Sequence, residues 1–277
     1  MKFKQVSIIG TGLIGGSLGL ALRRRGIARR VIGFSRSEKT IRRAIARGAI
    51  HEGDTELCAN WLGESDLVVL AVPPEEVVPM ARRIARMTRH SFLMTDMTSV
   101  KGPIVGRLDK ILPSRIRFVG SHPMAGSERS GIEAADAGLF RGAACVVTRT
   151  ARTDPAALRR IGRMWRAVDA EVIVMDPRRH DRLVAQISHV PHLTAAALTL
   201  FPETAAMPLA GGGFADLTRV AESDPEMWDQ ICRMNRKEIL AALNRLTAGL
   251  VKVRAAVARR SVRAALQLAH SRRSQFK

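Results

Sequence analysis

The stretch VSIIGTGLIGGSLGLAL, residues 6–22, decides the fold of this chain. Its first residues are typical of a buried strand, and an apolar helical segment begins directly after Gly12. The turn between them has the spacing G-x-G-x-x-G, which binds the pyrophosphate of a dinucleotide where it joins a strand to a helix. A glycine-rich turn kept only for packing is the alternative. We expect contacts to a dinucleotide from Gly10, Gly12, Leu13, Ile14 and Gly15.

Each glycine of this loop has its own task. Gly10 permits the tight turn, Gly12 lets the backbone approach the pyrophosphate, and Gly15 lets the helix pack closely on the strand. The N-terminus of the helix then faces the phosphate charge, which its unpaired amide groups attract.

Strand and helix signals alternate from this loop to about residue 175. Apolar strand runs are predicted at 5–10, 30–35, 66–72, 91–96, 117–122, 143–148 and 171–175. Helical segments are predicted at 13–26, 38–48, 75–87, 100–112 and 154–168. Short apolar strands separated by helices indicate a mostly parallel sheet with helices on both faces. The fold class is therefore α/β, with a Rossmann-type doubly wound domain over residues 1–176.

Residues 177–277 are predicted to form an all-helical second domain. A long helix covers 178–201, with a kink expected at Pro191, and two amphipathic helices are expected at 226–246 and 249–270. Little else in the chain remains to cover the apolar faces of these helices. We therefore expect a homodimer built mainly by this domain.

The segment GFSRS, residues 33–37, indicates which dinucleotide is bound. An NAD site normally carries a carboxylate at the end of this strand, whereas Ser35, Arg36 and Ser37 offer a cation and two hydroxyls to a 2′-phosphate. This favours NADP, and NAD remains possible if Arg36 only stacks on the adenine. Val72 and Pro73 follow the next strand, and we expect them to line the cofactor as well.

The segment GSHPMAG, residues 120–126, places a histidine at the carboxyl end of a predicted strand. Ligands of doubly wound sheets bind at these strand ends, so His122 should face the nicotinamide. Oxidation of an alcohol carbon needs a base for the hydroxyl proton, and histidine suits that role near neutral pH. An exposed histidine in a turn is the alternative. Thr98 or Ser99, after another strand, is expected to cap the following helix.

Five strings together resemble the prephenate/arogenate (cyclohexadienyl) dehydrogenase family of tyrosine biosynthesis. They are GTGLIGGSL (10–18), TDMTSVKG (95–102), GSHPMAGSERSG (120–131), HD…AQISHVPH (180–192) and GGGFADLTRVAESDPEMW (211–228). The resemblance implies an NAD(P)-dependent oxidative decarboxylation of prephenate, arogenate or both, which are small anionic substrates. Many members carry Asp where this chain has Ser35, which puts NAD use in doubt but not the reaction.

The resemblance also implies roles for individual residues. His122 and Ser99 would act on the reacting hydroxyl, Arg219 would bind a substrate carboxylate, and His189 and His192 would lie near the substrate. Each has a plainer alternative: a helix cap for Ser99, a surface position for Arg219, and a packed pair for His189 and His192. We expect no metal site from that pair.

Two other motifs in these strings are given lesser roles. His180-Asp181 starts a predicted helix, and Asp181 is interpreted as a complement to that helix's dipole. Glu128 would border the substrate entrance.

Composition limits the other classes of function. The formal net charge of +20, from 45 Lys and Arg against 25 Asp and Glu, would attract polyanions, but aromatic residues make up only 4% of the chain. A basic nucleic-acid-binding protein is thus a remote alternative, and a β-hydroxyacid dehydrogenase of similar architecture is a nearer one. Three scattered cysteines indicate free thiols, and no signal peptide or membrane span is read, so we expect a cytoplasmic enzyme with no membrane or nucleic-acid partner.

Overall fold

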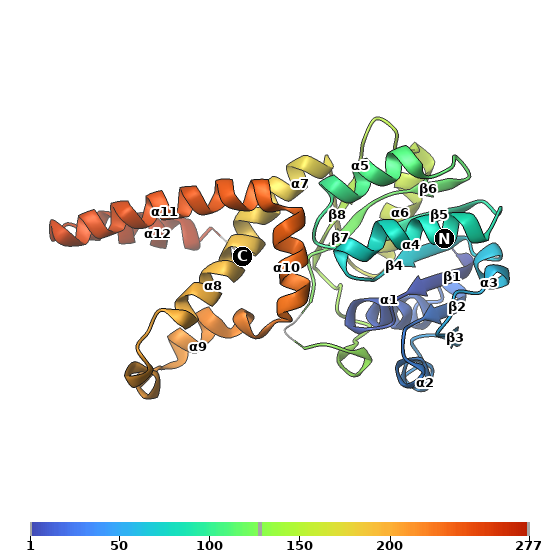
Figure 1. The fold of residues 1–277 in the computed structure, drawn as a ribbon, viewed down its shortest axis with the longest axis horizontal. Coiled ribbons are helices and arrows are strands. Elements are labelled where there is room, and N and C mark those ends of the chain that lie inside the picture. Colours follow the sequence, from blue (N-terminus) through green and yellow to red (C-terminus); the bar gives the residue numbers. More distant parts are fainter. Residues whose placement is uncertain (1, 127–128, 276–277) are drawn as a thin grey trace.

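The computed structural model describes residues 2–126 and 129–275. An α/β part built around two sheets is followed by helices that extend away from it, with α8, α9, α11 and α12 projecting furthest (Figure 1). The predicted fold class, a doubly wound α/β domain followed by a helical part, is confirmed.

The main sheet has six strands, all parallel, in the order β3-β2-β1-β4-β5-β6. The strands are β1 (Phe3–Ile9), β2 (Ala28–Phe34), β3 (Glu52–Asp54), β4 (Leu67–Leu70), β5 (Phe92–Asp96) and β6 (Ile116–Phe118). The reversal of strand order between β1 and β4 is the switch point at which doubly wound sheets bind ligands. β3 was not predicted, because its three residues carry no apolar pattern.

Helices cover both faces of this sheet. One core layer joins the sheet to α1 (Leu13–Arg24), α2 (Glu38–Ala46) and α6 (Pro155–Ala167). The other joins it to α3 (Ala59–Gly63), α4 (Val77–Met87) and α5 (Gly102–Ile111), with the short turn η1 (Pro74–Glu76) before α4. Strands buried on both faces explain the near-continuous apolar runs in the sequence.

The strand predicted at 117–122 is two strands in two sheets, so that prediction was wrong. After β6, the chain crosses at Gly120 into β7 (Ser121–Pro123), which pairs antiparallel with β8 (Ala144–Thr148); β8 pairs parallel with β9 (Glu171–Met175). A Cβ on Gly120 would lie 2.7 Å from Thr148 Oγ1, so only glycine fits this crossing. The second sheet therefore starts where the first one ends, and its first strand carries His122.

Beyond β9 the described chain is helical. A continuous segment begins with α7 (Pro177–Val184), passes through the π-helical turn η3 (Ala185–His189) and ends with α8 (Val190–Leu200). The kink expected at Pro191 stays a prediction; the structure has a π turn that ends two residues before this proline, which cannot donate a backbone hydrogen bond.

This segment is long and apolar enough, by composition, to cross a membrane, and a third of its apolar window is buried. A helix in the core of a soluble protein can have the same length and apolar composition. His180, Asp181 and His189 are buried on it, which is consistent with a core helix that serves a polar site.

The remaining helices differ from the predicted ones in their boundaries. They are η4 (Thr204–Leu209), α9 (Gly212–Thr218), η5 (Arg219–Glu222), α10 (Pro225–Met234), α11 (Arg236–Ala258) and α12 (Arg263–Arg273). The helix predicted at 226–246 breaks at Asn235, whose φ of −107° and ψ of 22° are not helical. The next break falls near Arg260, with a φ of 52°, so α11 runs through Gly249 where a boundary was predicted.

Candidate active site

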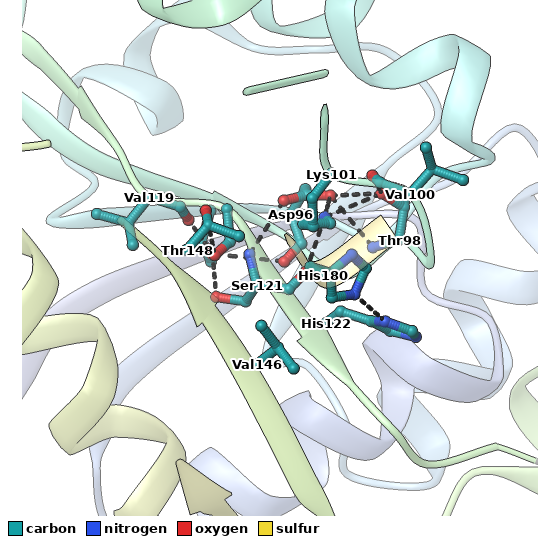
Figure 2. A network of polar contacts seen from close by, with 12 residues as sticks. Asp96, Thr98, Val100, Lys101, Val119, Ser121, His122, Val146, Thr148 and His180 are labelled. Carbon is teal, nitrogen blue, oxygen red and sulfur yellow. Dashed lines mark hydrogen bonds and ion pairs between the residues drawn. The ribbon is translucent and has the colours of Figure 1, made fainter. Parts of the chain in front are cut away.

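A buried polar network joins the end of β5 to the start of β7. Lys101 forms an ion pair with Asp96 and donates hydrogen bonds to the Ser121 carbonyl oxygen (2.8 Å) and to Thr98 Oγ1 (3.1 Å). Asp96 also accepts from the Ser121 amide at 3.2 Å. Figure 2 shows these side chains in one cluster with His122, the residue that follows Ser121. The network fixes the backbone from which the His122 ring projects.

The Lys101–Asp96 pair is fully buried, with both side chains 0% exposed. Burial lowers the pKa of Lys101, and the charge of Asp96 opposes that shift. Removing one partner of such a pair typically costs about 3–5 kcal/mol, because the other charge is left without compensation. The pair therefore holds two strand ends together rigidly.

His122 begins a chain of three side chains that sequence reasoning did not connect. Its Nδ1 lies 2.8 Å from His180 Nε2, and His180 Nδ1 lies 2.8 Å from Asp181 Oδ1 (Figure 2 shows the two rings). All three side chains are buried. His122 comes from β7, whereas His180 and Asp181 come from α7, so the chain joins the second sheet to the first helix of the helical part.

The hydrogen-bond inventory assigns a tautomer to each ring. A carboxylate only accepts, so His180 carries its proton on Nδ1 and its Nε2 has a free lone pair. That lone pair accepts from His122 Nδ1–H, and a neutral His122 therefore has an unprotonated Nε2. The same logic orients the histidine of a Ser-His-Asp triad. In this site the orientation passes through a second histidine.

Burial keeps these rings neutral. The pKa of His122 lies well below its usual value, first because of burial and then because of the nearby His180, Lys101 and His189. Burial also lowers the pKa of His180, while its hydrogen bond to Asp181 acts in the opposite direction. His122 Nε2 is therefore available as a proton acceptor across the neutral pH range.

Asp181 has a second set of partners that corrects two predictions. Its carboxylate accepts from the backbone amides of Lys101 (2.8 Å) and Gly102 (2.7 Å) at the start of α5. Asp181 thus caps α5 and not its own helix α7, whose cap is Asp176. The expectation that Thr98 or Ser99 caps α5 was wrong: Thr98 Oγ1 instead donates to Asp96 Oδ2 at 2.5 Å.

Ser99 lies half-buried between Thr98 and Val100, close in sequence to this network. No hydrogen bond of its hydroxyl to another residue of the described chain is present, so the hydroxyl is available to a ligand.

His189 and His192 lie together on the π turn and the start of α8. His192 stacks on Trp228 with ring centroids 3.4 Å apart, and His189 meets the same indole edge-on at 5.9 Å. Both histidines are buried, and burial lowers the pKa of His189 to about 4. Asn235 Nδ2 lies 3.1 Å from His189 Nδ1 and donates to the Asp181 carbonyl oxygen at 3.0 Å. These two histidines, expected near the substrate, are packed against Trp228 and linked through Asn235 to the His122 chain.

Arg219 is exposed at the first residue of η5, a turn that packs against α8. Glu128 lies outside the described residues. Among the residues that the structure describes, no group of three or more His, Cys, Asp or Glu side chains could hold a metal ion.

The glycine loop has the geometry of a phosphate-binding turn. Gly10 has a φ of 97°, and a Cβ there would lie 2.1 Å from the Ala71 carbonyl oxygen; a Cβ on Gly15 would lie 1.9 Å from the Gly10 carbonyl oxygen. Gly12 is different, because nothing lies within 4 Å of a Cβ built on it. Gly12 is also the N-cap of α1, which has no side-chain cap and no acidic residue in its first turn. This open, neutral helix N-terminus fits a dinucleotide pyrophosphate.

Comparison with known proteins agrees with this geometry. A family model described as prephenate dehydrogenase, nucleotide-binding domain, matches residues 18–174, and one described as prephenate dehydrogenase, dimerization domain, matches residues 176–268. The chain is 34% identical to the prephenate dehydrogenase of Bacillus subtilis over 90% of this chain and 69% of that protein. The chain belongs to the prephenate dehydrogenase family.

Solved structures of the family show the same fold. Prephenate dehydrogenase from Aquifex aeolicus, in complex with hydroxyphenyl propionate and NAD⁺, superposes with a TM-score of 0.93 at 30% identity and covers 100% of this chain and 99% of its own. Synechocystis arogenate dehydrogenase superposes with a TM-score of 0.83 at 27% identity, covering 99% of this chain and 100% of its own. This member of the prephenate dehydrogenase family is accordingly an NAD(P)-dependent dehydrogenase.

The structure places the backbone of Asp54 beside the loop where the 2′-phosphate of this dehydrogenase's cofactor is expected. Arg36 is exposed and makes no ion pair within the described chain, and Ser37 Oγ caps α2 by accepting from the Thr40 amide at 3.4 Å. However, the unpredicted strand β3 brings Asp54 beside Ser35, whose amide donates to the Asp54 carbonyl oxygen at 3.3 Å. Val72 and Pro73 follow β4 and are at least partly exposed at the same edge of the sheet.

Proposed function

We propose that this dehydrogenase oxidatively decarboxylates prephenate, arogenate or both in tyrosine biosynthesis. A hydride leaves the ring carbon that bears the hydroxyl, the hydroxyl proton leaves with it, and the ring carboxylate departs as carbon dioxide. The electrons of the broken carbon–carbon bond complete the aromatic ring, and the proton held by the base returns to the ring oxygen, which gives a phenol. The nicotinamide cofactor, when bound, accepts the hydride. The chain's own task is to bind, to orient and to take the proton.

The observation that carries this proposal is the hydrogen-bond chain that ends at His122. With Nδ1–H committed to His180, the free lone pair of His122 Nε2 is the base for the substrate hydroxyl. Asp181 stabilises the imidazolium that forms, because its negative charge lies one ring away. His122 is thus proposed as the catalytic base, and Ser99 as the hydroxyl that hydrogen-bonds the same substrate oxygen.

The remaining predicted residues are proposed to bind ligands. Arg219 would hold a substrate carboxylate through charge-assisted hydrogen bonds, and His189 and His192 would border the bound substrate. The glycine loop, with Leu13, Ile14, Val72 and Pro73, would hold the dinucleotide.

We further propose NADP as the preferred cofactor. The guanidinium of Arg36 is available to a 2′-phosphate, and the hydroxyls of Ser35 and Ser37 lie on the same loop. NAD remains possible if Arg36 only stacks on the adenine, so NAD use is expected to be measurable rather than absent. A cytoplasmic location is proposed because Cys58, Cys145 and Cys232 are all free thiols.

The domains are proposed to divide at residues 176 and 177, and the second is proposed to form a homodimer. Large apolar side chains are exposed along α11 and α12, among them Leu240, Leu250, Val251, Val257 and Leu266. A second copy of the same domain would bury them across a two-fold axis. Light scattering that gives a mass near 30 kDa at micromolar concentration would contradict the dimer.

The decisive experiment is an assay of prephenate and arogenate, each with NAD and NADP, followed by nucleotide absorbance. The proposal requires turnover of at least one substrate, with the higher kcat/KM for NADP. The double variant Ser35→Asp, Arg36→Ala should reverse the cofactor preference, because a lost charge pair and a new repulsion are each worth about 1.5–3 kcal/mol. A wild-type preference for NAD would show that Arg36 does not reach the ribose.

A further inference from the structure

Asn235 occupies an unusual position between two helices of the second domain. It ends α10 and precedes α11, with non-helical φ and ψ, and its side chain is buried with 4% exposure. The amide nitrogen Nδ2 donates to the Asp181 carbonyl oxygen at 3.0 Å and lies 3.1 Å from His189 Nδ1. One buried amide therefore touches both the segment that orients His122 and a second histidine of the site.

The chemistry of these contacts leaves one assignment of protons. A backbone carbonyl only accepts, so the atom that faces Asp181 O is the NH₂ group of Asn235 and not its oxygen. An amide nitrogen does not accept hydrogen bonds, so His189 Nδ1 must accept the second N–H of the same group. A neutral His189 ring then carries its proton on Nε2.

This Nε2–H group has nothing to bind within the described chain. It is buried and has no hydrogen-bond partner there, and the whole His189 side chain is 0% exposed. Buried N–H groups without a partner are rare in folded proteins. The ring stays neutral near pH 7 because burial outweighs the nearby Asp181, while His180 and His192 act in the same direction as burial. A fixed, neutral donor without a protein partner is suited to a ligand atom that accepts.

We propose that Asn235 is a positioning residue that holds His189 in its Nε2–H tautomer, so that this ring donates a hydrogen bond to an acceptor oxygen of the substrate. The inference rests on the proposed function for the identity of that substrate. The acceptor is a carboxylate oxygen or the side-chain keto oxygen. An ammonium group in the place of the keto oxygen only donates, and it would gain nothing from this histidine.

The tautomer is measurable without any substrate. In protein with ¹⁵N-labelled histidine, long-range ¹H–¹⁵N correlation spectra distinguish a protonated ring nitrogen from an unprotonated one. At pH 7 the signals of His189, assigned by their loss in His189→Gln, should show a protonated Nε2 and an unprotonated Nδ1. A wild-type protein with the proton on Nδ1, or on both nitrogens, overturns the proposal.

Asn235→Asp reverses the polarity of the contact with little change in shape. Its carboxylate only accepts, so His189 should move its proton to Nδ1 or become charged. Asn244→Asp, the same change at an exposed position on α11, is the matched control and should leave the His189 signals unchanged. Asn235→Ala, which removes the amide, should give a mixture of the two tautomers.

Steady-state kinetics then test the substrate contact. Loss of one such hydrogen bond should raise the KM of the accepted substrate about 10-fold or more in Asn235→Asp, with a smaller change in kcat and none in Asn244→Asp. A rise in KM for prephenate alone identifies the keto oxygen as the acceptor of the His189 hydrogen bond. An equal rise in KM for prephenate and arogenate identifies a carboxylate oxygen as the acceptor. Unchanged KM values, with the tautomer shown to be reversed, overturn the substrate contact. A chain that turns over neither substrate contradicts the proposed function, whereas the spectra still decide the tautomer.

Discussion

Replacement of Asp181 by Asn tests whether His122 is oriented through His180. In the wild type, Oδ1 of Asp181 accepts from His180 Nδ1–H and from the Lys101 amide, and Oδ2 accepts from the Gly102 amide. The side chain of an asparagine has one oxygen, which can take the place of Oδ1 or of Oδ2 but not of both. Either orientation of the amide therefore points an N–H donor at a backbone N–H.

Both orientations lower the rate, by different amounts. If the amide nitrogen faces His180, the ring must accept on Nδ1, its proton moves to Nε2, and His122 loses the free lone pair on its own Nε2. Asparagine behind a catalytic histidine costs about 10⁴-fold in the Ser-His-Asp triad for this reason. If the oxygen keeps facing His180, the tautomers persist, but the charge that stabilises the imidazolium is gone. A charge-assisted hydrogen bond is worth about 1.5–3 kcal/mol, or roughly 10- to 150-fold in rate.

The assay is the initial rate of reduced cofactor formation at saturating substrate. We expect kcat of Asp181→Asn to fall by at least about 10-fold and by as much as about 10⁴-fold, with the KM for cofactor nearly unchanged. Asp176→Asn is the matched control, because the Asp176 carboxylate caps the same helix through the Arg178 and Arg179 amides. The contact of Asp176 with His180 is a backbone hydrogen bond, which the substitution keeps. A kcat within threefold of wild type in a folded Asp181→Asn protein would refute the role of this chain in catalysis.

Three other outcomes follow from the same geometry. His122→Asn should lower kcat by about 10²–10⁴-fold, and a wild-type kcat in this variant would remove His122 as the base. Arg219→Ala should raise the substrate KM by about 10- to 100-fold, and an unchanged KM would place Arg219 away from the substrate. The pKa of His189 is lowered to about 4, so its contribution to stability is present above the unfolded pKa near 6.5 and is lost as pH falls toward 4. At pH 5 this loss is about 2 kcal/mol, so urea unfolding at fixed protein concentration should show a smaller decrease between pH 7.5 and 5 in His189→Gln than in wild type.

The sequence predicts the parts of this molecule that depend on local pattern. These parts are the glycine loop, the buried strands of the main sheet and the helices between them. Each has a residue spacing or periodicity that can be recognised within its own segment, without knowledge of what the segment packs against. The second sheet was missed because an apolar run such as β8 looks the same whichever strand it pairs with. β3 was missed because its exposed residues carry no strand pattern, and with it the approach of Asp54 to the cofactor loop.

The sequence predicts individual residues of the site but not the contacts between residues that are distant in the sequence. His122 was found because it follows a strand in a loop of small residues, but its partner His180 lies 58 residues away in the sequence. The pair His180-Asp181 was read as the start of a helix, and nothing in the sequence tells which helix an aspartate caps. Asn235 lay inside a predicted helix, where an asparagine carries no signal.

Asp181 explains why these missed residues belong together. Its carboxylate orients His180 and caps α5, while its backbone carbonyl accepts from Asn235. The α/β part supplies His122 and the dinucleotide loop, whereas the helical part supplies His180, Asp181 and Asn235, whose hydrogen bonds select the tautomers of His122 and His189. Arg233 on α10 adds a two-point ion pair to Glu75 of η1, at 2.9 and 3.0 Å, across the same junction. His122 therefore acquires the tautomer required of the proposed base only when α7 is docked on α5, so the proposed chemistry depends on contact between the two parts of the chain.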